Sequence, residues 1–289
     1  MIPRDLLPRA AALALLVACA ACASAPLQGT GSVAATDLVR SDGLLTRSLL
    51  NVDKGAVQAA RTVRILPTRF SDSIGETGMK PAQHALLANA VDRALCSTLN
   101  ERLEIAGGAP ADLTVRATVT HAAPTDPAAA FVSRAASLSV PLAVDIPVVV
   151  PRLPIGLGGL SVEAEALDKR GRRVAVMIWA RGADAVTSAP RVSKDGDAYD
   201  LASAFGSDFG TLVATGENPL AEPRLPSLRE MSRLLGAGPS SNACRAFGPS
   251  PGLAELIGRR IGLPPNWTDE GASSEQHATF RPRSRSGSQ

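Results

Sequence analysis

An apolar stripe over residues 82–103 constrains the fold of this chain more than any other feature of its sequence. Apolar side chains recur there at every fourth residue, with charged and polar residues between them. That period predicts an amphipathic helix, which Gly107-Gly108 would close. Because such a helix has to bury its apolar face against another layer, a packed globular domain is expected. The stripe consists of Leu87, Val91, Leu95, Leu99 and Leu103.

Three segments alternate between apolar and polar residues, the period that predicts β-strands. Residues 61–70 place Val63 and Ile65 on one face and arginines on the other. Residues 113–120 alternate in the same way. Residues 160–180 form two alternating runs around a turn at 168–171, which predicts a β-hairpin.

A second amphipathic helix is expected after the hairpin, with Asp197 as its cap and Gly216 at its end. The elements then run β-α-β, an irregular insertion, and β-β-α. This order predicts an α+β fold, a two-layer sandwich in which two helices cover one face of a mixed or antiparallel sheet of about four or five strands. The apolar face of the second helix carries Leu201, Phe205, Phe209 and Leu212.

The other segments are less regular. Residues 128–138 are expected to form a short helix. Residues 140–160 are apolar but contain four prolines, which excludes a regular helix or a central strand. A loop-rich extension is expected over 217–270, with helical fragments at 228–235 and 253–261, and a disordered tail over 271–289.

The amino terminus predicts export. Residues 10–18 form an apolar run, too short for a bilayer span of about 20 residues but typical of a secretory signal. The run ends in Leu16-Val17-Ala18-Cys19, which resembles the lipobox of bacterial lipoproteins. That resemblance implies a diacylglycerol on the Cys19 thiol and cleavage in front of it. An ordinary signal cut after Ala23 or Ala25 is the alternative, and Cys22 is a rival lipidation site.

A lipidated Cys19 would hold the protein stably on a membrane, since two or three acyl chains suffice for lasting attachment. Ala20 rather than aspartate follows it. By resemblance to the sorting rule of Gram-negative lipoproteins, this favours the periplasmic face of the outer membrane. The expected organisation is a signal peptide over 1–18, a lipidated flexible tether over 19–41 and the α+β domain over 42–216.

Charge and composition exclude a nucleic-acid-binding protein. The formal net charge is +3, and removal of Arg4, Asp5 and Arg9 with residues 1–18 lowers it to +2. Aromatic residues make up 3% of the chain, too few for a base-stacking surface. The hydrophobic share of 45% suits a globular core.

The elements over residues 40–216 resemble, in their order, the proteobacterial lipoproteins of domain-of-unknown-function family 3313. The strands 61–70 and 113–120, the hairpin with Val162-Glu-Ala-Glu165, Asp168 and Gly171, and the helix 200–212 carry the likeness. The resemblance implies a lipoprotein address and an α+β domain. It implies no activity, catalytic residue or cofactor. The extension after Gly216 departs from the shorter members.

The remaining cysteines suggest a disulfide. With Cys19 lipidated, Cys22, Cys96 and Cys244 are left, an odd number. In an oxidising compartment Cys96 and Cys244 are able to bridge the extension to the domain. Two separately buried thiols are the alternative, and Cys22 is expected to be free.

One segment matches the residue pattern of a serine-hydrolase motif but lacks the features that the motif needs. Gly248-Pro-Ser-Pro-Gly252 matches the G-x-S-x-G pattern. A nucleophile elbow needs a strand before it and a backbone N–H just after the serine. Pro251 has no N–H, and residues 242–247 make a poor strand. We therefore expect a turn before a short helix and no hydrolase activity at Ser250.

No other group of residues predicts catalysis, a metal or a cofactor. His84, His121 and His277 lack metal-binding spacing. Glu163 and Glu165 share one strand face, where they would bind a cation or, in the simpler interpretation, form ion pairs with Arg172 or Arg181. Residues 156–159 lack the lysine of a phosphate loop.

The sequence therefore predicts a non-enzymatic envelope lipoprotein, an accessory or scaffold domain with an envelope protein as its partner. A carrier of a lipid or other apolar ligand through residues 140–160 is the first alternative, and a hydrolase, which serine labelling lost in Ser250→Ala would support, is the second. Native mass spectrometry that finds copurifying lipid would favour the carrier. The arginine-rich tail at Arg281, Arg283 and Arg285 is expected to be solvated or to touch anionic headgroups.

Overall fold

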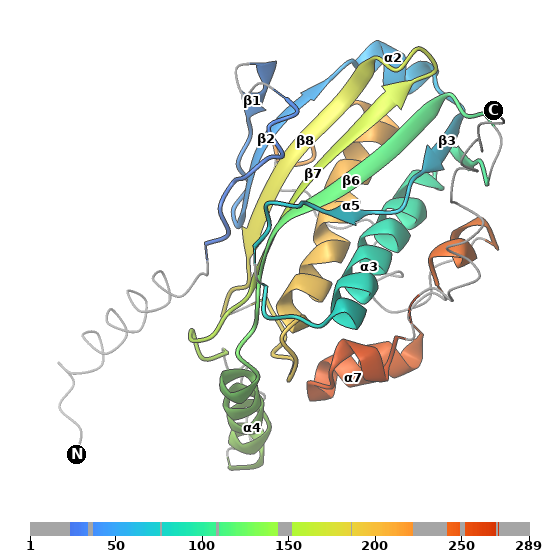
Figure 1. The fold of residues 1–289 in the computed structure, drawn as a ribbon. Helices are drawn as coiled ribbons and strands as arrows, with labels where there is room; N and C mark the ends of the chain where they lie inside the picture. The colour runs from blue at the N-terminus through green and yellow to red at the C-terminus, as the bar shows by residue number, and fades with distance from the viewer. Residues whose placement is uncertain are drawn as a thin grey trace, which may run out of the picture.

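The computed structural model describes residues 24–33, 37–75, 77–107, 110–143, 152–185, 187–221, 242–248, 252–269 and 271. The described residues form one mixed eight-stranded sheet with helices α3 and α5 on one face (Figure 1). The strand order is β1-β2-β8-β7-β6-β3-β5, and β4 pairs with β6 outside this path. The predicted α+β class is confirmed, but four or five strands was too low a number.

The centre of the sheet is the predicted hairpin and the strand before it. β6 (Leu113–Ala123), β7 (Gly159–Asp168) and β8 (Arg173–Gly182) are antiparallel neighbours. Gly171 turns the hairpin with φ +75°, a conformation that glycine adopts without strain. The alternating patterns of these segments therefore indicated their structure correctly.

The other five strands of the described sheet are shorter than these three. β2 (Thr46–Val52) pairs with β8, and β1 (Val39–Arg40) pairs with β2. On the other side, β3 (Thr62–Ile65) lies parallel to β6 and to β5 (Glu104–Ile105). The single strand expected over 61–70 is divided into β3 and β4 (Arg69–Phe70), because Pro67 between them has no N–H to donate.

Helix α3 (Pro81–Leu99) carries the predicted stripe but ends earlier than expected. Gly107-Gly108 does not close it, because Asn100 caps the helix and β5 follows. Leu103 continues the four-residue spacing of the stripe in the sequence, although it lies after the end of the helix. Its side chain is still buried in the core.

Helix α5 (Gly196–Thr215) ends at Gly216 with φ +70°, as predicted. Its cap is Asp195 rather than Asp197, whose carboxylate instead binds Arg152 and accepts the Gly158 N–H. Two glycines allow α5 to approach α3 closely. A Cβ on Gly206 would lie 2.3 Å from Ala94 Cβ, and one on Gly210 would lie 2.6 Å from Thr98 Cβ.

The core lies between the sheet and these two helices. The Trp179 ring meets Phe205 edge-on at 5.7 Å, and Phe205 stacks on Phe209 at 6.0 Å between centroids. All three side chains are fully buried. The short helix α2 (Lys54–Ala59) begins at Asp53, whose carboxylate accepts the Ala56 N–H.

The remaining described elements lie outside this sandwich. α4 (Pro127–Ala143) includes the expected helix at 128–138 but continues through Pro141, so residues 140–143 are helical against expectation. Residues 144–151 lie outside the described residues. The extension contains the 3₁₀ helices η2 (Asn242–Phe247) and η3 (Pro265–Trp267) and the predicted helix α7 (Leu253–Ile261).

No helix in the described part of the chain is long and apolar enough to cross a membrane. The expected signal peptide, the helical fragment at 228–235 and the tail from 272 onward lie outside the described residues.

Candidate functional site

The face of the sheet opposite α3 and α5 is crossed by residues 24–33, which we call the N-terminal strap. Its backbone carbonyls accept hydrogen bonds from the sheet. Ser161 Oγ donates to Pro26 O and Thr120 Oγ1 donates to Gln28 O, each at 2.6 Å. Arg47 donates to the carbonyl of Ala25. A flexible tether was expected over residues 19–41, whereas the strap packs against the sheet.

Glu163 binds the far end of the strap. Its carboxylate accepts the Thr30 N–H at 2.6 Å, the Thr30 hydroxyl at 2.8 Å and the Ser32 hydroxyl at 2.6 Å. The side chain is almost completely covered. Three donors on one carboxylate account for its burial, because a buried charge has to be hydrogen-bonded.

Glu165 lies two residues further along the same face, as the alternation predicted. It forms ion pairs with Arg116 and, at 2.6 Å, with Arg173. The expected partners Arg172 and Arg181 bind Asp168 and Asp184 instead. The cross-strand neighbours of β7 therefore determine the pairing. The two glutamates bind separate partners, so the structure does not bring them together as a cation site.

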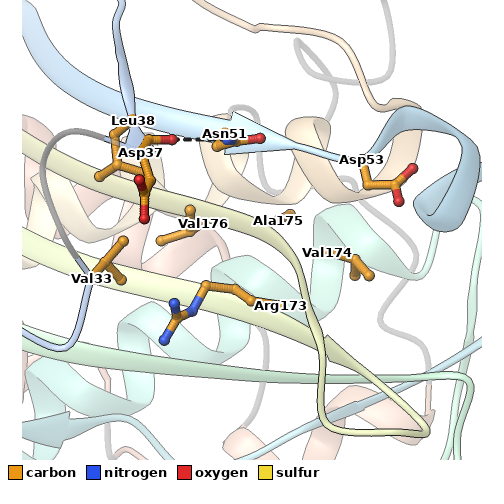
Figure 2. Close-up of a pocket in the computed structure, with 9 residues that line it drawn as sticks. All are labelled: Val33, Asp37, Leu38, Asn51, Asp53, Arg173, Val174, Ala175 and Val176. Carbon is orange, nitrogen blue, oxygen red and sulfur yellow. Dashed lines mark hydrogen bonds between the residues drawn. The ribbon is translucent and has the colours of Figure 1, made fainter.

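A shallow pocket opens between the end of the strap and the sheet (Figure 2). Its volume is about 230 Å³, below the roughly 300–1,000 Å³ of typical ligand sites. The polar groups around it already have partners. Arg173 binds Glu165, Asp53 caps α2, and Asn51 Nδ2 donates to Asp37 O at 2.8 Å. The other lining residues are Val33, Leu38, Val174, Ala175 and Val176.

The most strongly charged region of the interior lies where the C-terminal extension meets α3 and α5. We call Arg93, Arg191, Tyr199, Asp200, Glu255 and Asp269 the ionic cluster. Arg93 pairs with Asp269, and Tyr199 Oη donates to Asp269 Oδ2 at 2.5 Å. Arg93 Nη2 also lies 3.2 Å from Tyr199 Oη. Burial raises the pKa of Tyr199, so its hydroxyl stays protonated and acts as a donor.

The second half of the ionic cluster surrounds Arg191, whose side chain has no exposed surface. Its guanidinium pairs with Glu255 on α7 and lies 3.3 Å from Asp200 Oδ1 on α5. The same group lies over the Tyr199 ring, 5.2 Å from the centroid. Burial raises the pKa of Asp200, and Arg259 and Arg191 oppose that rise. These contacts join α7 to the sandwich.

Cys96 on α3 and Cys244 in η2 are bonded in a disulfide, with their Cα atoms 5.7 Å apart. They are 148 residues apart in sequence. Both side chains are buried, Cys96 completely. The extension is therefore held to α3 by a covalent bond as well as by the ionic cluster. Cys19 and Cys22 lie outside the described residues.

The other predicted candidates are not gathered into one site. His84 stacks on Phe70 at 4.4 Å and bonds Thr77, His121 lies on β6, and His277 is outside the described residues. Within the described ranges, no three His, Cys, Asp or Glu side chains form a group that would hold a metal ion. Ser250 is not among the described residues, but residues 242–247 before it form a 3₁₀ helix rather than the strand of a nucleophile elbow.

Two buried carboxyls away from the ionic cluster were not anticipated. Burial raises the pKa of Asp92 on α3 to about 7, although Thr68 donates two hydrogen bonds to it. Burial likewise raises the pKa of Asp208 on α5 to about 6, against a 2.8 Å hydrogen bond from Trp179 Nε1. Asp92 was visible in the sequence as an acid one position from the apolar stripe.

These two acids predict a pH-dependent stability. Between pH 4 and 7 the folded protein retains a proton on Asp92 that the unfolded chain, with an ordinary pKa of 3.8, releases. The free energy of unfolding from this group therefore falls as pH rises through that window, by up to about 4 kcal/mol. Asp92→Asn should flatten the slope in denaturant titrations run from pH 4 to pH 7.

Asp168→Asn is the matched control. A small loss of solvation at Asp168 is outweighed by hydrogen bonds from Arg172 and Arg170, so its pKa lies below the ordinary value. It is ionised in both states above about pH 5, and from there to pH 7 the slope should not change. An unaltered slope in Asp92→Asn would refute the assignment.

Comparison with known proteins gives a family but no activity. The family model described as "Protein of unknown function (DUF3313)" matches residues 31–209, more than half of the chain. No curated protein matches the sequence. Two similar solved structures are PelC dodecamers from Paraburkholderia phytofirmans, one of them a point variant. They are 10% and 9% identical, cover 59% of this chain and 98% and 99% of their own, and both have a TM-score of 0.36. Nothing about function follows from so distant a likeness.

Proposed function

Because the chain belongs to DUF3313, a family of proteins of unknown function, its role has to be inferred from its own residues, and we propose that it is a non-enzymatic lipoprotein of the cell envelope. In this proposal Cys19 carries the lipid, and the folded domain faces the periplasm from the outer membrane. There it serves as an accessory or scaffold for another envelope protein.

The disulfide between Cys96 and Cys244 is the observation that carries the proposal. Disulfides persist in oxidising compartments and are rare in the reducing cytosol. A buried bridge therefore supports export, and the signal-like run that ends at Cys19 supplies the route. The two features involve different cysteines and are independent of each other.

The strap supports the position of the anchor. The first described residue is Ser24, and Ala25 already accepts a hydrogen bond from Arg47 on β2. Only a few residues then separate the folded domain from Cys19. The strap is held through polar contacts to β6 and β7 and through the buried side chains of Ala25 and Val33. A lipid at Cys19 would thus hold the domain close to the bilayer.

The absence of catalysis is part of the same proposal. Glu163 and Glu165 are the carboxylates whose spacing first suggested chemistry, and both are occupied by strap or arginine donors. Tyr199 is held by Arg93 and Asp269. These contacts give the side chains of Glu163, Glu165 and Tyr199 structural roles.

Cys19→Ser is expected to abolish lipidation and release the protein from the membrane fraction. The thiol is the acceptor of the diacylglycerol, and a serine hydroxyl does not replace it. Metabolic labelling with a radioactive fatty acid, followed by separation of inner and outer membranes, measures both effects. Wild-type protein should be labelled and found in the outer membrane.

Cys22→Ser is the matched control and should leave labelling and membrane attachment unchanged. If Cys22→Ser loses the label while Cys19→Ser keeps it, the anchor is at Cys22. If Cys19→Ser keeps both the label and its location, Cys19 is not the anchor, and if the wild type takes up no label, the proposal of a lipoprotein is wrong. For the scaffold part of the proposal, crosslinking in intact envelopes followed by purification would identify the protein partner.

A further inference from the structure

Helix α7 turns its apolar face to solvent. Leu253, Ile257 and Ile261 follow one another at four-residue spacing and therefore share one side of the helix. Their exposed fractions are 69%, 51% and 48%. Trp267 follows in η3 and is 70% exposed. An exposed stripe of large apolar side chains on a monomer marks a surface that meets something else.

The orientation of α7 is fixed by its polar face, which points inward. Glu255 is buried and pairs with Arg191. Arg259 Nε lies 3.3 Å from Asp200 Oδ2. Rotation of the helix to bury its isoleucines would take Glu255 from Arg191 and Arg259 from Asp200, and the loss of charge partners in the interior is costly. The outward apolar face is therefore a stable property of the fold.

Helix α4 lies beside α7 at the same end of the molecule (Figure 1). Arg134 Nη2 on α4 donates to Arg259 O at 3.2 Å. Phe131 and Val132 on α4 are also exposed. We call Phe131, Val132, Leu253, Ile257, Ile261 and Trp267 the apolar end.

The charge around the apolar end is positive. The sequences of α4 and α7 contain three arginines and one acid. That acid, Glu255, is buried against Arg191, so it presents no negative charge at the surface. Arg260 is exposed and Arg259 is partly exposed. Anionic headgroups complement this combination of apolar and basic side chains.

The strap brings the chain terminus to the same end. Gly159, at the start of β7, is so close to Ala25 that a Cβ placed on it would lie 3.2 Å from Ala25 Cβ. In the loop before β7, Gly156 O accepts the N–H of Asp126, which directly precedes α4, at 2.9 Å. Cys19 and Ala25 are six Cα–Cα steps apart, a reach of at most about 20 Å. A lipid on Cys19 would therefore hold this end of the domain near the bilayer.

We infer that the apolar end rests on the lipid surface that holds the Cys19 anchor, with α7 lying in the plane of the interface. This inference rests on the proposed lipidation of Cys19. The isoleucines and Leu253 enter the boundary between headgroups and acyl chains, Trp267 sits at headgroup depth, and the arginines meet phosphates. The domain then has one fixed orientation instead of rotating freely on a tether.

The chain contains two tryptophans, which makes the contact measurable. Trp179 is fully buried in the core, whereas Trp267 belongs to the apolar end. Lipidated full-length protein is reconstituted in vesicles of phosphatidylethanolamine and phosphatidylglycerol with brominated acyl chains. Bromine should quench the Trp267 emission, and acrylamide in the water should not reach it. In Trp267→Phe the bromine-dependent loss should disappear.

Ile257→Glu tests the surface by a second route. A charge in the stripe should withdraw α7 from the lipid, so the bromine quenching falls several-fold and acrylamide quenching of Trp267 rises. Val39→Glu is the matched control, because Val39 is exposed as well, at 67% against 51% for Ile257, but lies on edge strand β1. In Val39→Glu the bromine quenching of the Trp267 emission should equal that of the wild type. Circular dichroism checks that both variants fold.

Flotation of the vesicles separates failure of the inference from failure of the proposed function. If the protein floats with the vesicles but Trp267 is quenched only by acrylamide, the anchor is present and the inference is wrong. If Trp267 is shielded from acrylamide without any bromine quenching, a second protein copy covers the apolar end, and the inference is again wrong. Protein that does not float refutes the anchor itself and the inference with it.

Discussion

Replacement of Cys244 by serine is expected to lower the free energy of unfolding by about 3 to 5 kcal/mol. The bridge to Cys96 closes a loop of 148 residues, which restricts the unfolded chain far more than a short loop would. Its loss also frees η2 from α3. Urea titration of the wild type and the variant, each without reductant, measures the difference.

Reduction of the wild type provides the control for this variant. Dithiothreitol should destabilise the wild type by nearly the same amount and should have no further effect on Cys244→Ser. Equal stability of the oxidised and reduced wild type would show that the disulfide does not hold the extension. A large loss in Cys244→Ser without any effect of reductant would instead assign the cost to the buried serine.

The second large effect is expected at Arg191. Arg191→Met keeps much of the side-chain volume but takes the buried arginine away from Asp200 and Glu255, so that Asp200 keeps only the partly exposed Arg259 and Glu255 keeps only the Thr268 hydroxyl. An uncompensated buried charge costs about 3 to 5 kcal/mol, so the free energy of unfolding should fall by that amount. Thermal and urea unfolding of the purified protein measure it.

Neutral partners should rescue this variant. Arg191→Met combined with Asp200→Asn and Glu255→Gln removes the unpaired charges and should recover much of the lost stability. Arg172→Met is the matched control, since its pair with Asp168 is exposed and such pairs contribute little. The interpretation fails if the triple variant is no more stable than Arg191→Met alone.

The elements that the sequence predicted well are those with long periodic patterns. Strand β7 alternates between apolar and polar residues from Leu160 to Ala166, β8 follows it as an apolar run after a clear turn, and the stripe of α3 runs from Leu87 to Leu99. By contrast, β1, β4 and β5 contain two residues each, too few to show any period. In β2 the adjacent Leu49 and Leu50 break the alternation. Leu50 is buried and Leu49 is partly covered, so an apolar side chain suits both positions.

The site was predicted less completely, because its contacts depend on which strands are neighbours. The spacing of Glu163 and Glu165 gave their common face, but Arg116 becomes a partner only through the register of β6 with β7. The strap has no periodicity, since it is held through its backbone carbonyls. Helix α7 reverses the usual rule that an amphipathic helix buries its apolar face. Its polar side is buried because Arg191 needs Glu255, and no local pattern reveals that need.

The extension that packs on the sandwich is synthesised well after the helix to which it is bonded. At about 5–20 residues per second, the 148 residues from Cys96 to Cys244 take roughly 7 to 30 s to make. Throughout that interval α3 has neither its disulfide partner nor the Asp269 that neutralises Arg93. The sandwich thus remains open on one side until residues 242–269 have been made. A chaperone that protects it has its natural binding surface on the faces of α3 and α5 that residues 242–269 later cover.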